Sequence, residues 1–176
     1  MSPGKQNESQ FNNSDFRLYD QIINFIYKPF GTIADISPVN QKMEYIKAKL
    51  GIEVTQLDCE DYNFPDFKGK FNVVCCFEVL EHLQNQLLFM IALKRLLKDK
   101  NSKLYLSMPG RIPFMWSKHH YFEIPPTHLD GWLLNNIGLR ILRKKRLRLK
   151  SPPFKDNLVG IRPDSLSDRH TFCTLH

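Results

Sequence analysis

Residues Phe71 to Leu83, FNVVCCFEVLEHL, form the stretch around which the chain is organised. Its first half, Phe71 to Phe77, is apolar apart from Asn72, and β-branched and aromatic residues dominate it. A short apolar run of this kind is typical of a strand buried on both faces, as in a parallel sheet covered by helices. We therefore expect a central strand here.

The second half of the stretch changes abruptly in polarity. Glu78, Glu81 and His82 follow the apolar run, and the next segment, up to Leu97, has helical spacing of its leucine and isoleucine residues. Ligand sites of open α/β proteins lie outside the carboxyl ends of the strands. A buried strand that ends in ionisable groups and leads into a helix therefore predicts a ligand site at this point.

The remaining segments alternate between helical and extended patterns. Spacing, caps and breakers predict helices at residues 15–27, 40–50, 87–97 and 127–136. They predict strands at residues 32–36, 52–57, 71–77, 103–107 and 139–149, with a weak final candidate at 170–175. This order indicates an α/β fold with a mostly parallel sheet of about five to six strands and helices on both faces.

The length of 176 residues and the apolar content of 42% fit one globular domain, which we place at residues 14–150. Residues 1–13 are expected to be a disordered tail, and residues 151–176 a C-terminal tail that holds the final strand candidate. No signal-peptide core is visible, and no stretch approaches the roughly 18 to 20 apolar residues of a membrane span. We therefore expect a cytoplasmic protein without a membrane partner. The four cysteines lack metal-finger spacing and are read as small hydrophobic residues in a reducing compartment: Cys59, Cys75, Cys76 and Cys173.

Much of the net charge of +7 lies in one stretch, Arg140 to Lys150, RILRKKRLRLK. A basic patch can bind nucleic acid or an anionic membrane. The apolar residues Leu139, Ile141 and Leu147 supply an interrupted alternation, which favours the solvent face of a half-buried strand instead.

Four segments, in the correct order, resemble class I S-adenosylmethionine-dependent methyltransferases. Residues 77–83, FEVLEHL, are similar to the F-E-V-I/L-E-H-L segment that many members carry after the fourth strand. Residues 54–61 resemble the strand with an acidic turn that precedes it, residues 104–109 the fifth strand, and residues 136–139 the end of the last helix before the sixth strand. The resemblance implies a Rossmann-like fold and S-adenosyl-L-methionine as the cofactor.

The glycine loop of that family is degenerate in this chain. The first strand of the family normally ends in D-x-G-x-G-x-G, whereas residues 34–40 read ADISPVN. Either residues 33–38 are the first strand with a degenerate loop, or they are the second strand and the first is missing. The first strand of this fold lies between the second and the fourth, so its loss would interrupt the hydrogen-bond ladder. We therefore expect the first alternative, with one βα unit missing at the edge of the sheet.

By this resemblance, the carboxyl ends of three strands would hold the cofactor. Asp58 would accept hydrogen bonds from the ribose, Cys59 would flank the adenine, and Phe77 and Glu78 would lie where the sulfonium meets the acceptor. The turn after the first strand would pass under the methionine end through Asp35, Ile36, Ser37, Pro38 and Asn40. The two aspartates read equally well as turn or cap acids.

The candidate catalytic residues are His82 and His119. A general base is needed where the acceptor must lose a proton, and an imidazole titrates near neutrality. The alternative for His82 is structural, as a cap of the following helix. Small-RNA 2′-O-methyltransferases carry a similar segment and hold a divalent ion with it; by that resemblance Glu78, Glu81, His82 and the pair His119-His120 would be ligands. Many relatives with this segment bind no metal there, so metal binding stays open.

The expected function is S-adenosylmethionine-dependent transfer of a methyl group to an unidentified acceptor, either a small molecule or RNA. One alternative is a non-catalytic module of the same fold that has lost cofactor binding, which the missing glycines motivate. Another is an RNA methyltransferase that uses the basic stretch for phosphate contacts. The sequence leaves the oligomeric state open.

Overall fold

The computed structural model describes residues 13–26, 31–37, 41–58, 64–109, 120–121, 129, 136–146 and 156–163. Within them, one sheet has the strand order β2-β1-β3-β4-β6-β5. Its strands are β1 (Ile33–Asp35), β2 (Thr55–Gln56), β3 (Val73–Phe77), β4 (Lys103–Pro109), β5 (Leu139–Arg146) and β6 (Asp156–Pro163). The first four are parallel, whereas β6 is antiparallel to both β4 and β5. The expected α/β, Rossmann-like, mostly parallel sheet is confirmed.

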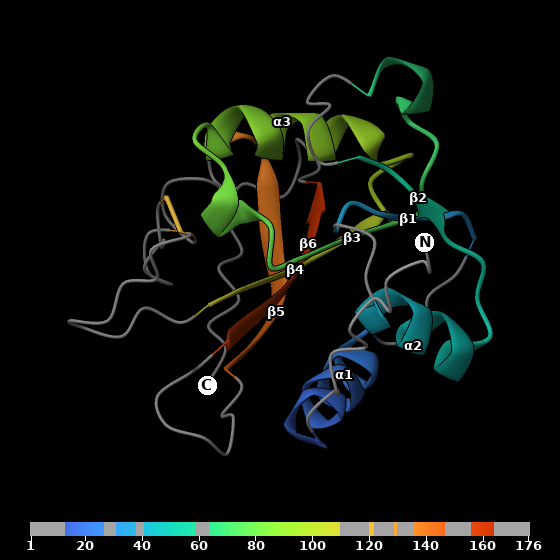
Figure 1. Cartoon of the computed structure of the whole chain (residues 1–176). Coiled ribbons are helices and arrows are strands. Elements are labelled where there is room, and N and C mark those ends of the chain that lie inside the picture. Colours follow the sequence, from blue (N-terminus) through green and yellow to red (C-terminus); the bar gives the residue numbers. More distant parts are fainter. Residues whose placement is uncertain are drawn as a thin grey trace, which may run out of the picture.

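Helices cover both faces of the sheet. They are α1 (Asn13–Phe25), α2 (Gln41–Leu50) and α3 (Gln86–Leu96), and the short 3-10 turns η1 (Pro65–Phe67) and η2 (Leu80–His82) lie between strands and helices. Figure 1 shows α3 on one face and α1 beside α2 on the other. Each face has its own apolar core, because α3 and the pair α1–α2 pack against opposite sides of the same strands.

Strand β3 is the centre of both cores. All five of its residues are buried, and their side chains alternate: Val74 and Cys76 belong to the α3 core, whereas Val73, Cys75 and Phe77 belong to the α1–α2 core. Burial of a large apolar side chain contributes about 1.5 to 3 kcal/mol. The unbroken apolar run is therefore explained by a strand that supplies both layers.

Strand β1 lies in the middle of the sheet, between β2 and β3. It pairs in parallel with both, with Asp35 opposite Gln56 on one side and Cys75 on the other. The expectation that residues 33–38 hold the first strand is confirmed, since a second strand of this fold would not pair directly with the strand that carries FEVLEHL. Within the described residues, β2 is the outermost strand at this edge. The expected loss of one βα unit stays a prediction.

The C-terminal part of the sheet differs from the expectation. Strand β6 begins at Asp156 and pairs with β4 over six residue pairs, so the sheet continues beyond the boundary expected at Lys150. The expected final strand at residues 170–175, the tail at 1–12 and most of the helix expected at 127–136 lie outside the described residues. Strand β2 is shorter than expected, with two residues in place of 52–57.

No helix in the described part of the chain is long and apolar enough to cross a membrane.

Candidate functional site

The turns that follow β1, β2 and β3 lie at one edge of the sheet. The Ile36 amide donates to the Cys75 carbonyl at 2.9 Å, and the Leu57 amide donates to the Asp35 carbonyl at 2.9 Å. The three strand ends are therefore held side by side. Because the strands are parallel, the segments at Ser37, Asp58 and Glu78 all leave the sheet at its carboxyl edge, where ligands of open α/β sheets bind.

Ser37 takes the place of the first glycine in the turn after β1, and its side chain points into the protein. Its hydroxyl donates to Asp35 Oδ1 at 2.9 Å and accepts from the Phe77 amide at 3.1 Å. Ser37 is only 2% exposed. The serine side chain therefore connects the ends of β1 and β3 inside the protein.

Glu78 follows β3 in a left-handed backbone conformation, with φ +56°. Such a conformation costs a residue other than glycine on the order of 1 to 3 kcal/mol and occurs preferentially at functional sites. The Glu78 amide donates to Ser107 Oγ at 3.1 Å, and the Ser107 hydroxyl donates to Glu78 Oε1 at 2.5 Å. These two bonds fix both the backbone and the carboxylate of Glu78 against β4.

Asp58 lies at the exposed end of β2, two residues beyond the strand. Gln56 reaches across to the neighbouring turn, where its side-chain amide donates to the Ser37 carbonyl. The acid is therefore solvent-accessible on a turn that is fixed to the turn after β1. Three further residues expected at the site, Pro38, Asn40 and Cys59, lie outside the described residues.

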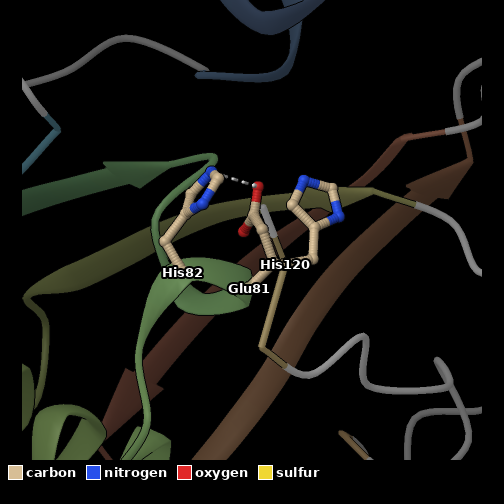
Figure 2. A group of neighbouring side chains, drawn as sticks. All are labelled: Glu81, His82 and His120. Atoms are coloured by element: carbon tan, nitrogen blue, oxygen red, sulfur yellow. Dashed lines mark ion pairs between the residues drawn. The ribbon is translucent and has the colours of Figure 1, made fainter. Parts of the chain in front are cut away.

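A second group of polar side chains surrounds η2. Figure 2 shows the Glu81 carboxylate between the imidazoles of His82 and His120. His82 Nε2 lies 3.8 Å from Glu81 Oε1, and the two imidazole rings are 5.0 Å apart in an edge-to-face arrangement. One ligand atom from each of the three residues lies within 4.8 Å of the others. Two imidazoles and a carboxylate are a donor set that can hold a metal ion or move a proton.

Two buried titratable groups lie behind the strand ends, in the α1–α2 core. Burial raises the pKa of the Cys75 thiol well above its usual range, and the nearby Asp35 raises it further. Burial also raises the pKa of Tyr105 to about 12, with a further increase from Cys75 and a decrease from Arg143. A protonated, fully buried thiol is a poor nucleophile, so Cys75 has a packing role. Cys75 and Cys76 are both buried thiols outside any disulfide, as expected.

Most of the described residues that the sequence predicted for the site lie at the carboxyl edge. Asp35, Ser37 and Phe77 are joined by hydrogen bonds, and the next residue, Glu78, is bound to Ser107. Ile36 instead packs into the α3 core. His119 lies outside the described residues.

The neighbouring residue His120 is the histidine that contacts His82. By the resemblance, His120 is a possible metal ligand, but it is not among the catalytic residues predicted from the sequence. Residues 111–124 lack a helical or strand period that would show which of the two adjacent histidines faces η2.

The basic stretch forms β5 over its described part. A bulge between Ile141 and Arg143 shifts the register against β6. The Arg143 guanidinium lies 4.9 Å from the centre of the Phe25 ring, so one of these cations packs on α1. The expectation of a strand here is confirmed.

The sheet order and the site at its carboxyl edge define an α/β protein of the Rossmann-like class. A family model described as a methyltransferase domain matches residues 18–144. The chain therefore belongs to the methyltransferase-domain family. A comparison with curated protein sequences finds no match.

Solved structures with the same fold include several methyltransferases. The 1,6-didemethyltoxoflavin-N1-methyltransferase of Burkholderia thailandensis, with bound S-adenosylhomocysteine, has a TM-score of 0.63 at 10% identity, over 87% of this chain and 79% of that one. The magnesium protoporphyrin IX methyltransferase of Synechocystis PCC 6803, also with bound S-adenosylhomocysteine, has a TM-score of 0.60 at 14% identity, over 93% and 90%. The cyclase SpnF has a TM-score of 0.61 at 12% identity, over 84% and 80%. At these identities the likeness is one of fold.

Proposed function

We propose that the protein is an S-adenosylmethionine-dependent methyltransferase that acts on a small-molecule acceptor. The observation that carries the proposal is the arrangement of the strand ends, with Ser37 turned inward between β1 and β3 and Asp58 exposed on the adjacent turn. Membership of the methyltransferase-domain family supports it. So do solved structures of the same fold whose names give a small-molecule acceptor and bound S-adenosylhomocysteine.

The described residues fit such a cofactor in two respects. Glycine is common in this turn because the backbone must approach the cofactor closely. Ser37 meets that need differently, since its side chain is used within the protein and does not project from the turn. An exposed carboxylate at the end of β2, such as Asp58, is well placed to accept hydrogen bonds from the two ribose hydroxyls.

The chemistry supplied by the cofactor is an activated methyl group on a cationic sulfur. The protein mainly contributes positioning and electrostatic surroundings. Phe77 and Glu78 would border the reacting centre, where the left-handed conformation of Glu78 directs the chain away from the sheet edge. His82 would remove a proton from an acceptor that must lose one, because Glu81 lies beside its imidazole and would stabilise the protonated ring.

A second candidate is a non-catalytic binding module of the same fold. The hydrogen bonds of Ser37 favour it, because they join the ends of β1 and β3 directly to each other. In this case the contacts at the carboxyl edge would stabilise the fold and would not bind a cofactor. The fold of the cyclase SpnF shows in addition that the architecture is not confined to proteins named methyltransferases.

Calorimetric titration with S-adenosylhomocysteine separates the two candidates. We expect binding by the full chain and a loss of about tenfold or more in affinity for Asp58→Asn, because a hydrogen bond to a charged group contributes about 1.5 to 3 kcal/mol. Glu53→Gln is the matched control, since this exposed acid lies before β2 at the opposite edge. A folded protein that binds nothing at about 1 mM ligand, the range of very weak complexes, would favour the binding module.

A further inference from the structure

The group formed by Glu81, His82 and His120 combines features of a metal site. Glu81 is 2% exposed, although it carries a carboxyl group, whereas His82 is exposed and His120 half-buried. Carboxylates are seldom fully buried unless they are paired or bind a cation. Figure 2 shows the Glu81 carboxylate between the two imidazoles, so one buried oxygen donor and two more exposed nitrogen donors lie together.

The backbone fixes this group from two directions. Glu81 and His82 are adjacent in η2, whose turn is closed by the bond from the His82 amide to the Val79 carbonyl at 3.0 Å. His120 comes from a distant segment that is attached to η2 by a bond from the Tyr121 amide to the Glu81 carbonyl at 2.8 Å. The imidazole of His120 is thus positioned by main-chain contacts that do not involve its own ring.

The distances are compatible with one ion. Zinc lies about 2.0 to 2.2 Å from nitrogen and oxygen ligands, so two tetrahedral ligand atoms are about 3.3 Å apart. The three ligand atoms lie within 4.8 Å of one another, and His82 Nε2 is separated from Glu81 Oε1 by 3.8 Å. These separations are slightly longer than those of bound ligand atoms, so ion binding would draw the three side chains together.

Glu78 is excluded from the set by its own contacts. Its carboxylate accepts from the Ser107 hydroxyl on β4, and its amide is bound to the same residue. The available donors are therefore two nitrogens and one oxygen. Imidazole ligands suit zinc and other transition metals, whereas magnesium and calcium prefer oxygen ligands alone.

We propose that Glu81, His82 and His120 bind one divalent transition-metal ion, with zinc as the best fit, and that the ion links the segment of His120 to η2. Three protein ligands leave at least one coordination position for water or another ligand. The site does not depend on cofactor binding, because none of its three residues is needed to hold the cofactor. With an ion bound through its imidazole, His82 would be a metal ligand in place of the general base described above.

The test uses untagged, metal-free full-length protein titrated with zinc by calorimetry and with cobalt by visible absorption. We expect one ion per chain with a Kd of about 10 µM or tighter, a cobalt spectrum with nitrogen ligation, and a rise in Tm with zinc but not with magnesium at equal concentration. His120→Ala should weaken zinc binding at least about tenfold, since even loss of groups that only support metal ligands costs 10- to 100-fold.

Two matched variants keep the result specific. His119→Ala removes the adjacent imidazole, and Glu78→Gln removes the nearby carboxylate charge, and both should keep zinc affinity within about twofold of the unaltered chain. Unchanged affinity in His120→Ala, or loss in His119→Ala instead, would overturn the assignment, as would absence of one-to-one binding. Glu81→Gln removes the buried oxygen ligand. Should this variant fail to fold, His82→Ala removes a ligand at an exposed position outside the core. Binding of S-adenosylhomocysteine, measured on metal-free protein, reports on the methyltransferase proposal separately.

Discussion

Removal of the Ser37 hydroxyl should destabilise the protein more than its size suggests. In Ser37→Ala, the Phe77 amide loses its 3.1 Å partner while it remains buried, and Asp35 loses a 2.9 Å hydrogen bond. A buried donor without a partner costs about 1 to 3 kcal/mol, and a lost hydrogen bond about 0.5 to 1.5 kcal/mol. We therefore expect the free energy of unfolding to fall by about 2 to 4 kcal/mol.

Urea denaturation followed by circular dichroism measures this change directly. Ser102→Ala is a suitable control, because this buried serine exchanges hydrogen bonds with Asp99 before β4, at the opposite edge of the sheet. The control should lose about 1 kcal/mol and keep its affinity for S-adenosylhomocysteine, whereas Ser37→Ala should lose both stability and affinity. A Ser37→Ala protein within about 0.5 kcal/mol of the unaltered chain, the range of ordinary surface changes, would refute the role given to the hydroxyl.

Two further predictions concern the strands behind the site. In urea denaturation, Gly31→Ala should lower the free energy of unfolding by about 1 to 2 kcal/mol more than Gly69→Ala. Both glycines have positive φ, but only a Cβ added at Gly31 meets the Asn72 side chain, which accepts two hydrogen bonds. Equal losses would contradict the steric argument. Raised pH should also destabilise the protein: the raised pKa of Cys75 means that the folded thiol keeps a proton that the unfolded chain releases above about pH 9, so stability falls by about 1.4 kcal/mol per pH unit. Cys75→Ala should reduce that slope between about pH 8 and 9.5, below the pKa of about 10 at which the unfolded chain releases the Tyr105 proton. An unchanged slope would show that Cys75 is not responsible.

The central layers of the fold could be predicted from the sequence because buried strands and helices have recognisable hydrophobic patterns. The apolar run of Val73–Phe77 requires helices on both faces, and the structure has them. The position of β1 followed from the need to complete the hydrogen-bond ladder beside β3, even though the glycine loop gave no help. Both predictions rest on interactions that every parallel sheet must satisfy.

Strand β6 was not predicted because its sequence lacks a clear strand pattern. Residues 156–163, DNLVGIRP, contain Gly160 within the strand and Pro163 at its end, and both disfavour a strand locally. The strand exists through pairing on both sides, with β4 and β5, and a contact between distant segments leaves no short-range pattern. Gly160 also lies opposite Arg143, at the bulge of β5.

The inward orientation of Ser37 could not be predicted for a related reason. When only the turn is considered, a serine in place of a glycine indicates that cofactor binding has been lost. Its hydrogen-bond partner is the amide of Phe77, which lies 40 residues further along the chain. The choice between His119 and His120 likewise depends on a backbone contact to η2 and not on any period in the segment.

The two borders of the sheet are protected by different means. An exposed strand border offers free backbone groups to which another chain can add, and short length, bulges and lysine or arginine residues are common defences. Strand β2 presents only two residues at one border, and β5 presents a bulged, cationic strand at the other. In the described part of the sheet, neither border therefore offers a long, flat strand to which another chain could add, and neutralising the arginines and lysines of β5 would remove the protection at that border.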